Sequence, residues 1–227
     1  MKRISTLFTA FLIAGSFSSF GQAVSPANTK KVAAVFSKDV QPPDLSKYSL
    51  ATFAGGNFWR EETLFGSVAG VVCVVPGYAG GGKTFPTYKD VETGTTGHVQ
   101  TVNIYYDSTK VSYATLLEVF FDSQEDPTQA ADEGPQYRNY IFYRSNVQKN
   151  LAQQNIDKLT NSGLYKKPIA TELVRFTLFW PAAENIQHYF YTHTDEPYVA
   201  KSINTIAKYQ KAHPALIKPD HNFSKVQ

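Results

Sequence analysis

Residues 55–60 read Gly-Gly-Asn-Phe-Trp-Arg and lie between a strand-like run at 48–53 and an amphipathic run at 58–65. Two glycines at a strand-to-helix junction allow a sharp turn and expose the next side chain at a helix N-terminus. The free N–H groups and the helix dipole favour negative charge there, so this place suits a reactive anion. The residue that occupies it is Asn57, whose carboxamide is not a nucleophile.

The chain has one cysteine, Cys73, in the middle of an apolar, mostly β-branched run at 71–75. This run predicts a strand that is buried on both faces. Burial raises the pKa of a thiol, so we interpret Cys73 as core filling and not as a catalyst. A single cysteine excludes an intramolecular disulfide and a dithiol relay within the chain. The sequence has no Cys/His cluster and no carboxylate-rich loop, so we expect no metal site and no cofactor.

A glycine-rich segment at 77–82 is followed by Pro-Thr-Tyr at 86–88. The segment lacks the glycine spacing of a phosphate-binding P-loop and runs into a proline, which favours a loop that brings backbone close to a site. The next strand-like run, 98–106, alternates and places Gln100 on the same face as Ile104. A buried amide needs partners, so Gln100 is either a satisfied structural amide or a group that points into a pocket.

The order of the elements predicts the fold. Periodicity and capping residues indicate strand 48–53, helix 58–65, strand 71–75, strand 98–106, helix 112–122, strand 139–143, helix 145–161, strand 168–176 and a helix from 197 that stops before 214. The first six elements follow the order of a split βαβ plait. We therefore predict an α+β, ferredoxin-like fold with additional helices and loops.

The composition predicts one domain with extensions, because the chain has 227 residues of which 42% are hydrophobic. A formal net charge of +3 gives no strong basic field, so nucleic acid is not expected as a partner. We divide the chain into a signal peptide at 1–21, a polar linker or arm at 22–47, a folded domain at 48–195 and a C-terminal helical extension at 196–227.

Residues 1–21 have the pattern of a secretory signal. Lys2 and Arg3 form a basic start, an apolar run follows at 7–17, and Ser19-Phe20-Gly21, with a small residue on either side of Phe20, suits a cleavage site. The apolar run is too short and too broken for a membrane span. We therefore predict an exported protein that resides in the periplasm or outside the cell.

Four separated motifs resemble the peptide methionine sulfoxide reductase A family over about residues 49–191. Residues 55–59 resemble its Gly-Gly-Cys-Phe-Trp signature, and 77–88 resemble its Gly-Tyr-Ala-Gly-Gly and Pro-x-Tyr segments. Residues 96–100 read Thr-Gly-His-Val-Gln, where the family has Thr-Gly-His-Ala-Glu. Residues 126–138 resemble its Asp-Pro-Thr and Asp-x-Gly-x-Gln-Tyr-Arg segments. The family fold, a ferredoxin-like plait with decorations, agrees with the predicted element order.

The resemblance implies peptide-methionine (S)-S-oxide reductase chemistry, in which a Cys thiolate attacks the sulfoxide sulfur and a Glu protonates its oxygen. Further cysteines or an outside reductant of the thioredoxin type then restore the thiol. Asn57 stands at the position of the nucleophile and Gln100 at that of the acid, and neither side chain can do this chemistry. We therefore expect a family member whose catalytic activity is impaired or absent.

The binding residues of the family are better kept. By the resemblance, Phe58 and Trp59 hold the methyl group of the substrate, and Tyr88, Asp132 and Tyr137 position the sulfoxide oxygen. An apolar slot with a few hydrogen-bond donors suits a dipolar S=O group beside a methyl group. We expect the chain to bind methionine sulfoxide or peptides that contain it.

Two alternatives stay open. The chain is an active reductase by a route that uses Cys73 and a thioredoxin-type reductant, or it is a partner-binding module with a vestigial pocket. In the second case the aromatic side chains are simply core. Residues 183–188 look like a worn copy of one more family segment, and no role is assigned to them.

Overall fold

The computed structural model describes residues 44–124, 126–129 and 134–221. Its strands are β1 (Ser49–Ala54), β2 (Val71–Ala79), β3 (Val99–Tyr106), β4 (Tyr140–Tyr143), β5 (Glu172–Arg175) and β6 (Phe179–Pro181). Its helices are α2 (Phe58–Gly66), α3 (Tyr88–Glu92), α4 (Tyr113–Asp122), α5 (Asn146–Thr160), α6 (Tyr189–Thr192) and α7 (Pro197–Ala212). None of the helices in these ranges is long and apolar enough to cross a bilayer. The predicted signal peptide lies outside the described residues.

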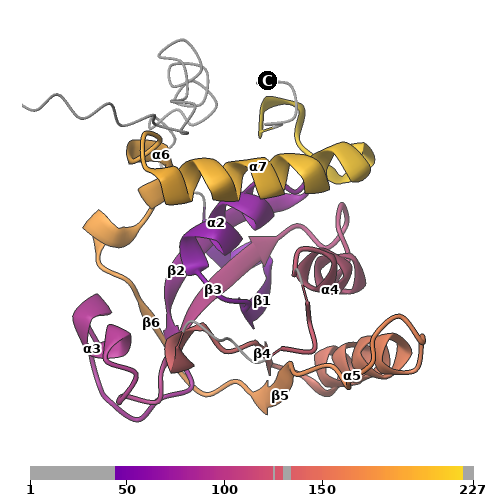
Figure 1. The fold of residues 1–227 in the computed structure, drawn as a ribbon, viewed down its shortest axis with the longest axis horizontal. Helices are drawn as coiled ribbons and strands as arrows, with labels where there is room; N and C mark the ends of the chain where they lie inside the picture. Colours follow the sequence, from indigo (N-terminus) through magenta and orange to yellow (C-terminus); the bar gives the residue numbers. More distant parts are fainter. Residues whose placement is uncertain (1–43, 125, 130–133, 222–227) are drawn as a thin grey trace, which may run out of the picture.

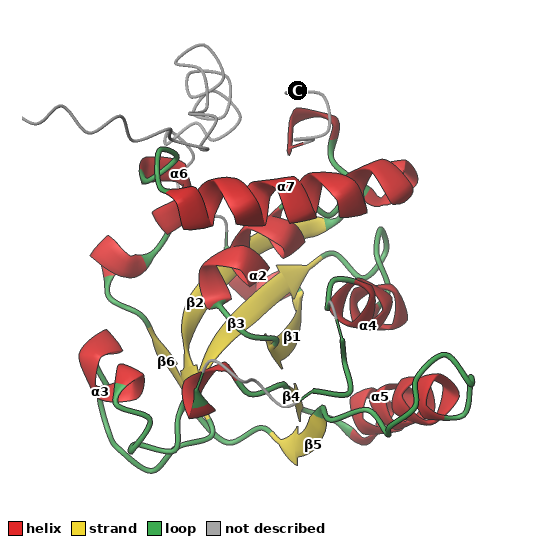
Figure 2. Cartoon of the chain, in the orientation of Figure 1, coloured by secondary structure: helices red, strands yellow, loops and turns green. Residues whose placement is uncertain are grey.

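All strands belong to one sheet in the order β5-β4-β1-β3-β2-β6 (Figure 2). The four inner strands β4, β1, β3 and β2 pair antiparallel with one another. Helix α2 connects β1 to β2 across the inserted β3, and α4 connects β3 to β4, as in a ferredoxin-like plait. β5 adds to one edge parallel to β4, and β6 adds to the other edge antiparallel to β2. The predicted fold class is therefore confirmed.

The main core lies between the sheet and the helices, and Phe53 of β1 is at its centre. The Phe53 ring is 5.7 Å from Phe65 of α2, 5.8 Å from Tyr113 and 5.1 Å from Phe120 of α4, measured between centroids. Such aromatic pairs contribute about 0.5–1.5 kcal/mol each beyond the burial of their area. Helix α7 contacts α2 and runs across it in Figure 1. These contacts fix α2, whose first turn carries the predicted site.

The opposite face of the sheet holds a polar cluster around Arg144. Its guanidinium donates hydrogen bonds to the hydroxyl of Thr52 (3.0 and 3.1 Å) and to Oδ1 of Asn103 (3.3 Å). It also lies 3.4 Å from the centre of the Phe176 ring. Burial lowers the pKa of Arg144, and the hydrogen bonds and the ring compensate for that burial. The cluster ties the segment after β5 to β1 and β3.

The structure differs from the sequence prediction along β2. The run at 71–75 is not buried on both faces, because Val72, Cys73 and Val75 are only partly buried. β6 pairs only with Gly77–Ala79, and the register between β2 and β3 shifts between Val71 and Cys73. This end of β2 is therefore an edge of the sheet within the described residues. The strand predicted at 168–176 is also shorter, because only Glu172–Arg175 pairs with β4.

β6 packs against β2 so closely that no side chain fits at Gly77. A Cβ there would collide with the carbonyl oxygen of Trp180 and the ring of Phe179. We expect Gly77→Ala to lower the free energy of unfolding by about 1–3 kcal/mol, because overpacking displaces β6. A Cβ at Gly82 meets no heavy atom within 4 Å, so Gly82→Ala is the matched control. Urea denaturation measures both variants, and equal stabilities would contradict this packing.

Candidate functional site

Helix α2 begins directly after Asn57, and the side chain of Asn57 caps it. Its Oδ1 accepts hydrogen bonds from the backbone N–H groups of Trp59 (2.9 Å) and Arg60 (3.4 Å). Gly56 has a φ angle of +98°, so the turn into the helix requires glycine. A cap of this kind stabilises a helix by about 1 kcal/mol relative to alanine. The carboxamide of Asn57 thus accepts hydrogen bonds from backbone N–H groups that would otherwise favour an anion.

Gln100 lies in β3 opposite Tyr78 of β2, and it is only 2% exposed. Its Oε1 accepts a hydrogen bond from the backbone N–H of Phe58 at 3.2 Å. Its side chain also forms a hydrogen bond with the Tyr88 side chain. Of the two interpretations from the sequence, the structure favours a satisfied amide, and its partners are two predicted site residues.

Phe58, Trp59 and Tyr88 form one aromatic cluster. The ring centroids are 5.4 Å apart for Phe58 and Trp59, 5.6 Å for Trp59 and Tyr88, and 6.2 Å for Phe58 and Tyr88. Phe58 is fully buried and also packs against Tyr78, with 5.8 Å between the centroids. Trp59 and Tyr88 are partly exposed. Phe58 therefore forms the floor of the cluster, and Trp59 and Tyr88 carry its accessible surface.

Tyr88 links this cluster to Tyr137. Burial, together with the nearby Tyr137 and Glu92, raises the pKa of Tyr88 to about 12. A side-chain hydrogen bond with Tyr137 acts in the same direction, and the one with Gln100 opposes it. The Tyr88 hydroxyl is therefore protonated at neutral pH and can donate a hydrogen bond. Asp132, the remaining predicted binding residue, lies outside the described residues.

Tyr189 also belongs to the cluster, and the sequence reasoning missed it. Its ring lies 4.0 Å from the Trp59 indole, with the planes 16° apart. The Trp59 Nε1–H donates to the backbone oxygen of Ile186 at 2.7 Å, from the same distant segment. Tyr189 in turn stacks on His193 (3.7 Å) and donates from its hydroxyl to Glu196 (2.8 Å). The only local signal was the i, i+4 spacing of Tyr189 and His193.

A buried carboxylate on α2 anchors the segment that carries Tyr189. Both oxygens of Glu62 accept from the backbone N–H of His188 at 3.1 Å, and Oε1 lies 2.8 Å from His188 Nδ1. The neighbouring Glu61 pairs with Arg60 at 2.9 Å. Burial raises the pKa of both carboxyl groups. Glu62 therefore fixes the residue before Tyr189 and so positions the ring that stacks on the indole.

Cys73 lies apart from Tyr78 and Gln100, although the charge of Glu62 on α2 reaches it. It precedes Tyr78, the neighbour of Gln100, by five positions in β2, which corresponds to roughly 16 Å along a strand. Burial, and then the charge of Glu62, raises the pKa of the Cys73 thiol. The predicted rise in thiol pKa is thus met, although Cys73 is only partly buried. At neutral pH the thiol is less ionised than a free cysteine.

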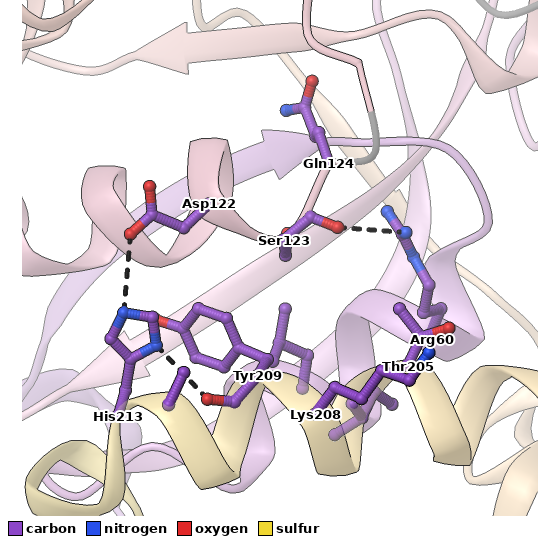
Figure 3. Close-up of a pocket in the computed structure, with 11 residues that line it drawn as sticks. Arg60, Asp122, Ser123, Gln124, Thr205, Lys208, Tyr209 and His213 are labelled. Atoms are coloured by element: carbon purple, nitrogen blue, oxygen red, sulfur yellow. Dashed lines mark hydrogen bonds and ion pairs between the residues drawn. The ribbon is translucent and has the colours of Figure 1, made fainter.

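A cavity of about 330 Å³ lies between α2, the end of α4 and α7 (Figure 3). Its lining consists of Arg60, Leu64, Asp122, Ser123, Gln124, Thr205, Ile206, Lys208, Tyr209, Ala212 and His213. None of the predicted site residues that the structure describes lines it, so this cavity is separate from the aromatic cluster. The described part of the chain contains no group of three or more His, Cys, Asp or Glu side chains that could hold a metal ion.

Comparison with known proteins agrees with this arrangement. Residues 49–216 match the family described as peptide methionine sulfoxide reductase. A peptide methionine sulfoxide reductase MsrA of Thermus thermophilus is 45% identical over 175 residues, which are 75% of this chain and 98% of that protein. The MsrA of Methanococcoides burtonii is 42% identical over 143 residues, which are 62% of this chain and 94% of that protein.

Solved structures show the same fold. Methionine sulfoxide reductase A of Corynebacterium diphtheriae superimposes with a TM-score of 0.58 at 27% identity, and the match covers 69% of this chain and 83% of that one. The sequence match extends over most of the described residues, from β1 to the segment beyond α7. The chain therefore belongs to the peptide methionine sulfoxide reductase family.

Proposed function

We propose that this family member binds methionine sulfoxide, free or within peptides, and that its reductase activity is impaired or absent. One observation carries the proposal. Asn57 and Gln100 accept hydrogen bonds from the first three free N–H groups of α2. By the family resemblance, these two residues stand at the positions of the thiolate and the acid. The first three backbone amides of α2 are therefore satisfied without either reactive group.

The first missing group is the nucleophile. Attack on a sulfoxide sulfur needs a soft anion that can carry the oxygen away as a sulfenic acid. The Asn57 carboxamide is neutral, and its oxygen is engaged in capping α2. The only thiol, Cys73, lies far along β2 and has a raised pKa, so the alternative route through Cys73 and a thioredoxin-type reductant is disfavoured.

The second missing group is the acid. The sulfoxide oxygen leaves only after protonation, and a carboxylic acid near neutral pKa is suited to supply that proton. Gln100 can donate a hydrogen bond but has no titratable proton. Tyr88, the neighbour of Gln100, holds its proton up to a pH of about 12 and does not replace a carboxylic acid.

The binding half of the site is supported by the aromatic cluster. The partly exposed Trp59 and Tyr88 rings offer an apolar surface for the methyl group of the ligand. The hydroxyl groups of Tyr88 and Tyr137 lie within one hydrogen-bonded group and suit an S=O acceptor. Asp132 is proposed as a further polar contact from the family resemblance. A vestigial pocket in a partner-binding module remains the competing hypothesis, and ligand binding distinguishes the two.

We also propose export to the periplasm or the extracellular space, on the basis of the signal pattern at 1–21. The chain expressed from Met1 in a bacterial host should appear outside the cytoplasm with a mature N-terminus at Gln22, as determined by mass spectrometry. Leu12→Arg interrupts the apolar run and should retain the full-length chain in the cytoplasm. Met1 at the N-terminus of the exported wild-type protein would contradict the proposal.

Binding is tested by isothermal titration with the two sulfoxide epimers of N-acetyl-methionine sulfoxide methylamide. We expect saturable binding of one epimer, and Trp59→Ala should weaken it at least ten-fold because the indole supplies the apolar wall. Leu164→Ala removes an exposed apolar side chain from the segment after α5 and is the control. If neither epimer binds the folded wild-type protein up to the solubility limit, the proposed binding of methionine sulfoxide is wrong.

The chemistry is tested by the double variant Asn57→Cys, Gln100→Glu. We expect no turnover of a sulfoxide substrate by the wild type with dithiothreitol, and measurable turnover by the double variant. Asn57→Cys alone should be at least 100-fold slower than the double variant, because a positioned general acid contributes about 10²–10⁴-fold. Cys73→Ala in each background is the control. Wild-type turnover that disappears in Cys73→Ala would show that the Cys73 route operates.

A further inference from the structure

Phe85 combines exposure with an unfavourable backbone conformation. Its side chain is 79% exposed, and its φ angle is +49°. A bulky residue rarely adopts the left-handed region, and a residue that precedes proline, as Phe85 precedes Pro86, favours an extended conformation. The Phe85 ring packs on Trp180 of β6, with 4.5 Å between the centroids. The chain thus keeps Phe85 exposed, packed on the partly buried Trp180, in a conformation that its local sequence opposes.

Trp180 of this pair lies in the same cross-strand row as Gln100 of the candidate site. Trp180 is opposite Tyr78 in the β2–β6 ladder, and Tyr78 is opposite Gln100 in the β2–β3 ladder. Residues opposite each other in a ladder point to the same face of the sheet, so the three side chains form one row. Two strand spacings separate Trp180 from Gln100, which is roughly 10 Å. Trp180 packs against the same core cluster as Trp59.

The loop before α3 carries Phe85 and leads into Tyr88 of the aromatic cluster. β2 ends at Ala79 and α3 begins at Tyr88, so the segment that carries Phe85 leads directly into a residue of the aromatic cluster. Leu178, the second residue before Trp180, is 54% exposed and extends the apolar surface at this edge. An exposed apolar surface that continues a binding site suits a longer ligand than one amino acid.

We infer that Phe85 and Trp180 form a subsite for an apolar side chain of a peptide whose methionine sulfoxide is bound at Trp59 and Tyr88. The inference rests on the proposed function. Gln100 accepts a hydrogen bond from the N–H of Phe58 and contacts Tyr88, so its distance of roughly 10 Å from Trp180 approximates the span between the sulfoxide and the subsite. An extended chain advances about 3.3–3.6 Å per residue, so this span corresponds to about three residues. The partner is therefore an extended polypeptide with an aromatic or large aliphatic side chain about three residues from the sulfoxide.

The test uses seven-residue peptides of Gly and Ser with the preferred sulfoxide epimer of methionine at the centre. One peptide carries Phe three residues before the sulfoxide, one carries it three residues after, and the reference carries Ser at both places. Isothermal titration should give at least five-fold tighter binding for one Phe peptide than for the reference, because the added ring is removed from water.

The variant Phe85→Asn tests whether the tighter binding of the Phe peptide depends on the Phe85 ring. Asparagine tolerates the left-handed region, so this variant removes the ring and should keep or raise the melting temperature. It should abolish the advantage of the Phe peptide and leave the affinity of the reference peptide unchanged. Trp180→Ala should do the same where its melting temperature shows a folded protein. Leu164→Asn removes another exposed apolar side chain, which is 76% exposed, and should keep the advantage.

The outcomes separate the two proposals. Equal affinities of the Phe and reference peptides for the wild type overturn the subsite and leave the proposed binding of the sulfoxide intact. An advantage that survives in Phe85→Asn also overturns the subsite. Failure of every peptide and of the free sulfoxide compound to bind overturns the proposed function and the subsite with it.

Discussion

The first turn of α2 carries N–H groups that have no partner within the helix, so their partners must come from outside it. Three of these groups are satisfied by two uncharged side chains. Gln100 accepts from Phe58, and Asn57 accepts from Trp59 and Arg60. The orientation of the aromatic pair that follows Asn57 depends on these hydrogen bonds, since they fix where the helix begins and how it faces β3.

Contacts from the far end of the domain complete this arrangement. The carboxylate of Glu62 holds the backbone at His188, and the Trp59 indole donates to Ile186. Both contacts join residues that are more than 120 positions apart in the sequence. The same helix therefore serves as the floor of the site and as the anchor of the segment that stacks against it. Loosening that segment would change the site without any change in α2 itself.

The elements that the sequence predicted well are those governed by local periodicity. The apolar spacing at 112–122 and the helix from Pro197 correspond to α4 and α7, and alternation placed Gln100 on the same face of β3 as the buried Ile104. Alternation predicts the face of the strand on which a side chain lies but not the groups that it contacts, so the hydrogen bonds of Gln100 were not predictable.

The errors have physical causes of the same kind. The burial of Cys73 was overestimated because edge position depends on how far β6 extends along β2. Tyr189 was missed because its stacking on Trp59 is a long-range contact. The conformation of Phe85 contradicts the rule for a residue before proline, so the sequence does not predict it.

The neutral cap on α2 has a consequence for durability. Methionine sulfoxide forms where peroxides are present, and a thiolate at a helix N-terminus is itself oxidised under those conditions, in steps that end irreversibly. Asn57 and Gln100 contain no sulfur, and the chain has only one Cys and one Met, at positions 73 and 1. The junction between β1 and α2 is therefore chemically inert toward peroxide. It keeps its hydrogen bonds without a reductant, whereas a cysteine in the same place would have to be reduced again after each oxidation by peroxide.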